Sequence, residues 1–72
     1  MTLVNQAREG VRKALEIKDL SPWKASKNAG LNQNQCMRFL NAKNDITFKT
    51  YEKLCEEGIG MPAHVVMELG RW

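Results

Sequence analysis

Residues 21–42, SPWKASKNAGLNQNQCMRFLNA, decide the fold of this chain. Ser21 followed by Pro22 predicts the start of a helix, because serine caps a first turn and proline suits the first helical position. Gly30 is expected to end that helix by taking the left-handed conformation that reverses the chain. A second helix follows at once, so the stretch predicts two short helices joined by a tight turn.

This second helix is expected to begin at Asn32 as N-cap, with Gln35 three residues later as in a capping box. At 100° per residue its side chains divide into two opposite arcs. The inner arc carries Gln35 together with Cys36, Phe39 and Leu40. The outer arc consists almost entirely of hydrogen-bonding side chains, and its members are Gln33, Asn34, Met37, Arg38 and Asn41.

A third helix is expected before this pair, over about residues 3–18, with Thr2 as its N-cap. Gly10 weakens its middle slightly. Apolar side chains recur at helical spacing and form one stripe for the core. The stripe consists of Leu3, Val4, Ala7, Val11, Ala14 and Leu15.

Two more helices are expected after the pair. One spans about residues 48–57, is capped by Thr47 and is ended by Gly58. Its inner side carries Phe48, Tyr51, Leu54 and Cys55. The last helix lies within residues 61–70, starting near a proline and ending at a glycine.

Length and composition bound the remaining possibilities. A chain of 72 residues allows one small domain, 1–72, which buries only about 60% of its unfolded surface. No stretch alternates as a strand would, so the expected fold is all-α, a compact domain of five helices. No apolar run approaches the roughly 18 residues of a membrane span, and the N-terminus does not resemble a secretory signal. We therefore expect a cytoplasmic protein with no membrane partner.

The cysteines, Cys36 and Cys55, both fall at inward positions of predicted helices. Buried free thiols fit a reducing cytoplasm better than a disulfide framework. A zinc site would need more ligands than these two and His64, which is expected at the surface. No metal, cofactor or small-molecule ligand is expected.

Charge is unevenly distributed along the chain, although the net charge is only +3. Residues 1–50 carry nine Lys/Arg against four Asp/Glu, which gives +5, and residues 51–72 carry two against four, which gives −2. A basic part and an acidic end suggest one face that binds a polyanion and another that does not. A mixed, solvated surface explains the same charges equally well.

With this helix order, the chain resembles the Cro and phage-repressor (XRE-like) type of helix-turn-helix DNA-binding domain over nearly its whole length. The resemblance rests on residues 25–39 and 47–60. Ser26 stands where the family has a small residue, Gly30 is the turn glycine and Leu31 is the apolar plug that follows it. The family resemblance implies a lambda-repressor-like fold.

The chain departs from the family pattern at two places. Pro22 and Trp23 occupy the region where the family often has a glutamine that contacts phosphate. We expect Trp23 to pack on the first or the last helix. Leu40 and Ala42 stand where the family often ends this helix with an acidic residue and a glycine.

The resemblance implies that Gln33, Asn34 and Arg38 contact DNA bases. The chemistry agrees, because a major groove about 12 Å wide admits one helix. Arginine donates to guanine O6 and N7, while glutamine and asparagine pair with adenine N6 and N7. Met37 on the same face is suited to a thymine methyl, and Asn41 completes the set.

Phosphate contacts are expected around this face, from lysines and from polar residues at or beside exposed helix starts. Each of these residues is also explained by simple solvation. The candidates are Ser21, Lys24, Lys27, Asn32, Lys43, Thr47 and Lys49.

The last segment holds more apolar side chains than can all point inward, which suggests a self-association patch. A two-fold dimer would hold two reading helices about 34 Å apart and bind a palindromic operator. The expected dimer contacts are Met61, Val65, Val66, Leu69 and Trp72.

The function expected from these features is a sequence-specific regulator of transcription that binds double-stranded DNA, a small repressor from a phage, prophage or mobile element. A protein-interaction module on the same scaffold, such as an anti-activator or antitoxin part, is the alternative. An enzyme is not expected, because one histidine and no phosphate loop or paired carboxylates leave no catalytic set.

Overall fold

The computed structural model describes residues 2–43 and 45–71, and every regular element within these ranges is helical. The all-α expectation is therefore confirmed. The described part of the chain measures 28 × 23 × 19 Å. Its elements are α1 (Leu3–Lys18), α2 (Pro22–Asn28), α3 (Gln35–Leu40), α4 (Phe48–Lys53), the π-helical segment η1 (Leu54–Ile59) and α5 (Ala63–Leu69).

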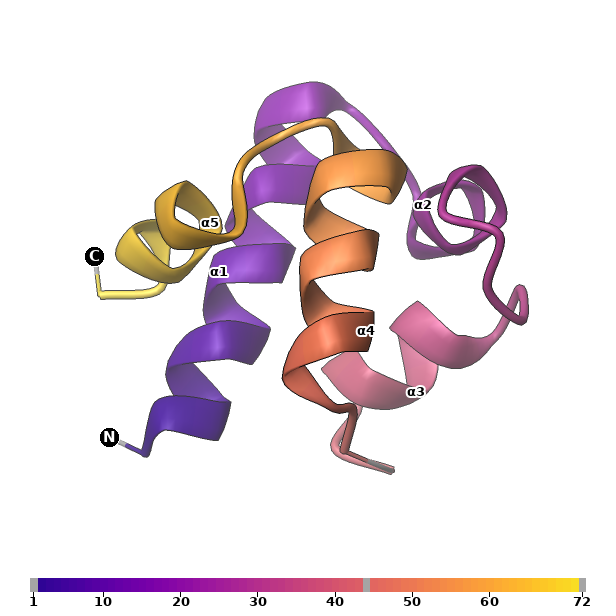
Figure 1. The fold of residues 1–72 in the computed structure, drawn as a ribbon. Helices are drawn as coiled ribbons and strands as arrows, with labels where there is room; N and C mark the ends of the chain where they lie inside the picture. The colour runs from indigo at the N-terminus through magenta and orange to yellow at the C-terminus, as the bar shows by residue number, and fades with distance from the viewer. Residues whose placement is uncertain (1, 44, 72) are drawn as a thin grey trace.

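The long helix α1 lies beside α4 and η1, which follow one another without a break (Figure 1). Helix α5 packs on α1, whereas α2 and α3 lie on the opposite side of the molecule and pack on each other. Helix α3 also contacts α1, and α2 contacts η1. The pair α2 and α3 thus packs on the rest of the domain through α1 and η1.

Three of the predicted helix starts form as local side-chain chemistry dictates. Thr2 Oγ1 accepts a hydrogen bond from the Asn5 N–H at 3.1 Å. The corresponding bonds of Ser21 and Thr47 cap α2 and α4 at 3.1 and 3.2 Å. Each satisfies one of the N–H groups that a first turn leaves without a helical partner.

The predicted start of α3 is wrong. The helix begins at Gln35, and no capping box forms at Asn32. Instead Asn32 Oδ1 accepts from the N–H of Asn34 at 3.0 Å, and its carbonyl accepts from the Gln35 N–H at 2.9 Å. Asparagine readily makes such a local turn. Gln33 and Asn34 consequently lie in a turn ahead of the helix.

The predicted end at Gly58 is also wrong, because the chain continues as η1 to Ile59 and turns at Gly60, with φ 90°. Gly58 is buried and faces the Ala25 carbonyl of α2, where a Cβ would collide. The glycine therefore permits a close approach of two segments. Phe48, expected on the inner side, is 73% exposed.

The same kind of approach decides the contact between α1 and α5. A Cβ on Gly10 would collide with the Val66 carbonyl, so this glycine lets α5 lie directly on α1. The apolar stripe of α1 is buried at Val11, Ala14 and Leu15. Its first two members, Leu3 and Val4, are exposed, contrary to the expectation for the core.

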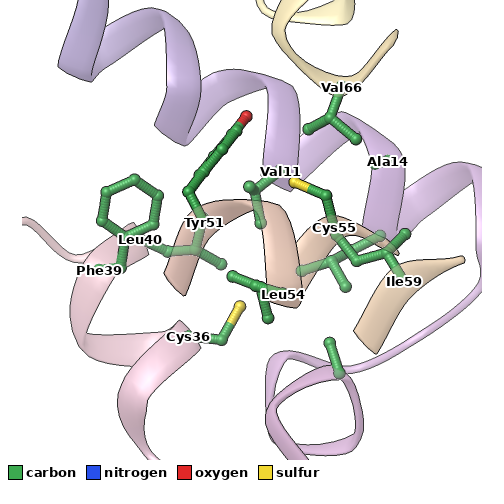
Figure 2. Packing of buried hydrophobic residues seen from close by; sticks show 12 residues of the cluster. Val11, Ala14, Cys36, Phe39, Leu40, Tyr51, Leu54, Cys55, Ile59 and Val66 are labelled. Atoms are coloured by element: carbon green, nitrogen blue, oxygen red, sulfur yellow. The ribbon is translucent and has the colours of Figure 1, made fainter. Parts of the chain in front are cut away.

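Side chains from α1, α2, α3, α4, η1 and α5 meet in one core (Figure 2). Cys36, Leu54 and Cys55 lie at its centre and are at most 1% exposed. Both thiols are free, as expected. Because burial disfavours the thiolate, it raises the pKa of Cys36 to about 11 and that of Cys55 to about 12.

Candidate nucleic-acid interface

A buried hydrogen bond fixes how α2 and α3 meet. The hydroxyl of Ser26, which is 0% exposed, accepts from the backbone N–H of Cys36 at 3.0 Å. Cys36 lies in the first turn of α3, where an N–H has no helical partner. Helix α2 therefore supplies the N-terminal cap of α3, which sequence spacing alone did not reveal.

The turn between the two helices uses the predicted glycine. Gly30 has φ 72°, in the left-handed region. The N–H of Leu31 bonds back to the Ser26 carbonyl at 2.9 Å, and the Leu31 side chain packs against the core. The turn thus directs the chain from α2 into the segment before α3, as Gly30 and Leu31 were expected to do.

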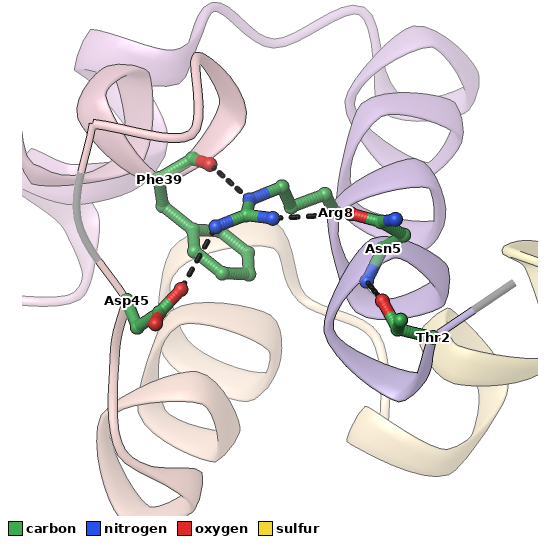
Figure 3. Close-up of polar contacts among 5 residues, drawn as sticks. All are labelled: Thr2, Asn5, Arg8, Phe39 and Asp45. Carbon is green, nitrogen blue, oxygen red and sulfur yellow. Dashed lines mark hydrogen bonds and ion pairs between the residues drawn. The ribbon is translucent and has the colours of Figure 1, made fainter.

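Arg8 of α1 caps the other end of α3 (Figure 3). Its Nε–H donates to the Phe39 carbonyl at 2.8 Å, and Nη2 donates to Asp45 Oδ1 at 2.8 Å. The guanidinium also lies over the Phe39 ring, 5.3 Å from its centroid. One half-buried arginine thereby joins the end of α3, the loop that follows and α1, which also contributes Asn5 Oδ1 as an acceptor at 3.2 Å.

Arg12, one turn further along α1, donates from Nη2 to the Leu40 carbonyl at 3.2 Å. Basic side chains commonly satisfy the last carbonyls of a helix. Helix α3 lacks a glycine at its end, and Ala42 takes the left-handed conformation with φ 57°. Two arginines one turn apart on a neighbouring helix, together with a short helix that has no terminal glycine, are the sequence signal for this end cap, and net charge alone does not reveal it.

The predicted division of α3 into two faces is confirmed. Cys36, Phe39 and Leu40 are buried on the inner side. All five residues of the outer arc are exposed: Gln33, Asn34, Met37, Arg38 and Asn41.

The outer arc does not form one uniform surface. Gln33 and Asn34 line a shallow depression together with Trp23 and Lys27 of α2. Met37 and Asn41 line a second recess, beside the end of α1. Glu16, Asp19 and Arg12 contribute to this recess, so its border carries two acidic groups and one basic group. Arg38 lines neither depression and is open to solvent.

Trp23 was expected to pack on the first or the last helix. Instead it lies beside the outer arc and is 44% exposed. Its Nε1–H donates to Gln33 Oε1 at 2.8 Å. The ammonium nitrogen of Lys27 lies 5.1 Å from the centroid of its ring. This residue is a member of the site that apolar periodicity could not identify, because its partner lies ten residues away.

The residues predicted to contact phosphate are all exposed. Three of them already accept a local backbone N–H through a side-chain oxygen, namely Ser21, Asn32 and Thr47. Among the residues that the structure describes, no ion pair involves the four lysines of the set, Lys24, Lys27, Lys43 and Lys49, or Arg38. These five cations remain available to an anionic partner.

The predicted dimer residues need one correction. Val66 is 0% exposed under α1, so its side chain cannot contact a second chain. Met61 and Leu69 are half-buried against the core, and Val65 is half-buried beside a shallow recess. Trp72 lies outside the described residues.

A separate apolar groove lies between the starts of α1 and α4 and the middle of α5. It encloses about 220 Å³ and includes Leu3, Val4, Phe48 and Met67 in its walls. Leu3 and Phe48 are 56% and 73% exposed. The most exposed apolar side chains near the groove are therefore those of Leu3 and Phe48, on α1 and α4, and not those of α5.

The described residues hold no group of three or more His, Cys, Asp or Glu that could bind a metal ion. No helix in residues 2–43 and 45–71 is long and apolar enough to cross a membrane. A scan against protein-family models and searches of the curated proteins and the solved structures found no match for this chain.

Proposed function

We propose that this chain is a sequence-specific, double-stranded-DNA-binding regulator of transcription with a helix-turn-helix reading head formed by α2 and α3. The observation that carries the proposal is the exposed set of hydrogen-bonding side chains on α3 and on the turns at its two ends, with the helix anchored at both ends. Ser26 holds the start of α3, and Arg8 and Arg12 hold its end. A reading helix must present its side chains in fixed positions, because base edges are distinguished by the pattern of donors and acceptors.

In this proposal Gln33, Asn34 and Arg38 make the principal base contacts. Each is exposed, and each carries donors of the kind that base edges accept. Met37 and Asn41 contact bases at the edge of the footprint, because Glu16 and Asp19 border their recess and would repel phosphate there.

The five unpaired cations would supply affinity that does not depend on sequence, by releasing counterions from DNA phosphates. Ser21, Asn32 and Thr47 contribute at the same border as hydrogen-bonding groups that steady the turn and helix starts. A second copy of the chain is part of the proposal, because a two-fold dimer would place two reading helices one DNA turn apart. Because Val66 is buried, the proposed dimer contacts are Met61, which precedes α5, and Val65 and Leu69 on α5.

A small repressor of a phage, prophage or mobile element is the regulator that fits best. The alternative function, a protein-interaction module, is favoured by the apolar groove, whose Leu3, Val4 and Phe48 side chains are exposed in the single chain. The two functions differ in what the exposed face of α3 does. In the alternative, changes to that face would leave DNA affinity as it was.

Fluorescence anisotropy with a labelled duplex of mixed sequence, at two salt concentrations, tests the proposal. Arg38→Ala is compared with Arg71→Ala, which removes the same charge from an exposed residue beyond α5. The proposal predicts binding that weakens with salt and weakens further in Arg38→Ala than in Arg71→Ala. Absence of binding at low salt would contradict it and favour the protein-interaction module.

A further inference from the structure

The bond between Trp23 and Gln33 joins two exposed residues across the junction of α2 and α3. Water can hydrogen-bond to both groups when they are exposed, so the 2.8 Å bond contributes little to the free energy of folding. Its effect is on orientation. It fixes a side chain that the proposed function places against the bases.

An indole N–H can only donate a hydrogen bond, whereas an amide has an accepting oxygen and a donating nitrogen. Trp23 therefore fixes which end of the Gln33 amide faces it, because only Oε1 can accept from Nε1–H. The Nε2 group is left on the other side. Among the hydrogen bonds of the described residues, none uses the two N–H groups of Gln33 Nε2.

Trp23 is itself held in place. Its ring lies beneath the Lys27 ammonium, 5.1 Å from centroid to nitrogen, which is a cation–π distance. Gly30 and Leu31 of the turn line the same depression as Trp23. Lys27, Trp23 and Gln33 thus form a chain of contacts that ends in one oriented amide.

We propose that Trp23 is a positioning residue that makes Gln33 read a hydrogen-bond acceptor and reject cytosine. This inference rests on the proposed DNA-binding function and adds a specificity to it. On the strand that Gln33 contacts, adenine and guanine present the acceptor N7 and thymine presents O4 in the major groove, whereas cytosine presents the N4 donor and the acceptors lie on its partner guanine. A free glutamine can rotate its amide to accept from cytosine, but one held by Trp23 presents N–H groups.

Two substitutions separate this role from a structural one. Trp23→Phe keeps an aromatic ring for Lys27 but removes the N–H, so the amide of Gln33 is free to rotate. Gln33→Glu keeps an oxygen for Trp23 but removes every donor, so the side chain should now accept from cytosine N4. Circular dichroism and thermal unfolding of each variant establish that the fold is kept.

The experiment starts from a duplex that the wild-type protein selects. Each position of that duplex is replaced in turn by the other three base pairs, and the relative affinity of the protein for every duplex is measured. Gln33→Ala identifies the position that Gln33 reads. There the wild type should bind cytosine at least about tenfold more weakly than its preferred base, and Trp23→Phe should lower that ratio by about fivefold or more. Gln33→Glu should shift the preference towards cytosine.

If the wild type selects a site but Trp23→Phe keeps the same ratio against cytosine, this inference is overturned and the proposed function stands. If the wild type selects no site, the proposed function fails first. Nuclear magnetic resonance of the free protein gives an independent result, since Gln33→Ala should move the Trp23 Nε1–H resonance. An unmoved resonance would also overturn the inference.

Discussion

The hydroxyl of Ser26 accepts a hydrogen bond from the Cys36 N–H at 3.0 Å, and both residues are 0% exposed. One helix therefore caps the next through a side chain in the core. The residue at the N-cap position of α3, Asn34, makes no side-chain cap bond. The stability of α3 and its exposed chemistry thus depend on different residues.

Ser26→Ala should destabilise the domain by about 1–3 kcal/mol, because it leaves the buried Cys36 N–H without a partner. Urea unfolding followed by circular dichroism measures the change. Asn34→Ala is the matched control, with an expected change within about 0.5 kcal/mol, since Asn34 is exposed and makes no cap bond. If Asn34→Ala proved the more damaging, α2 would not be the cap of α3.

Gly10→Ala should destabilise the domain even though alanine favours a helix by about 0.8–1.0 kcal/mol over glycine. The reason is steric, because the added Cβ would collide with the Val66 carbonyl and push α5 from α1. Glu16→Ala, at an exposed position of the same helix, should leave the midpoint temperature of thermal unfolding nearly unchanged. A thermal midpoint that rises in Gly10→Ala would show that α5 does not lie on α1 in this way.

Arg8→Ala should destabilise the domain by about 1–3 kcal/mol, because the Phe39 carbonyl loses its charged donor and keeps only the Ala42 N–H, and Asp45 loses its counter-charge. Arg8→Lys should recover little of this, since a lysine cannot reach two acceptors with a rigid fork. The control is Arg71→Ala, whose exposed pair with Glu68 at 3.5 Å should contribute less than about 1 kcal/mol. Equal losses in Arg8→Ala and Arg71→Ala would contradict the capping role.

Stability should fall in alkaline solution through the buried thiols. Burial raises the pKa of Cys36 from 9.0 to about 11 and that of Cys55 from 9.0 to about 12. Above pH 9 the unfolded chain has therefore released protons that the folded chain keeps, so the free energy of unfolding decreases as pH rises towards 11 and 12. Below pH 9 this contribution is fully present.

Urea unfolding at pH 8 and pH 10.5 measures this effect, and Cys36→Ala removes one of the two thiols. The variant should lose less stability than the wild type between the two pH values. An aromatic disulfide reagent should also react with the folded protein at pH 8 far more slowly than with the unfolded chain. Fast reaction with the folded protein would contradict the burial of both thiols.

Helix starts could be predicted where the cap is local. Thr2, Ser21 and Thr47 each bond to an N–H three residues ahead, which spacing alone encodes. The same logic failed at Asn32, because its side chain closes a local turn with Asn34. The cap of α3 came instead from Ser26, ten residues before Cys36 in the chain and on another helix.

The role of two glycines also differs from the role that the sequence predicts. Gly10 was interpreted as a weak point in its helix and Gly58 as a helix end, but each allows a backbone carbonyl of another segment to approach. Local propensity carries no information about such contacts. Gly30 was interpreted correctly because a turn with positive φ is a local property.

The exposed side of α3 could be predicted from helical periodicity, since burial of Cys36 and Phe39 fixes which side chains face outward. The supporting residues could not. Arg8, Arg12 and Trp23 reach α3 or its preceding turn from other helices, and only the packing of those helices brings them there. Helical periodicity therefore predicts the exposed face of α3, whereas the residues that hold α3 in place depend on how the helices pack.

Selection of bound sequences from random duplex DNA, with wild type and Arg38→Ala side by side, tests sequence-specific reading most directly. We expect the wild type to enrich a palindromic site and Arg38→Ala to lose the preference at one position of each half-site. Weak, salt-sensitive binding without an enriched sequence, or an identical motif from both proteins, would contradict the claim that α3 reads DNA.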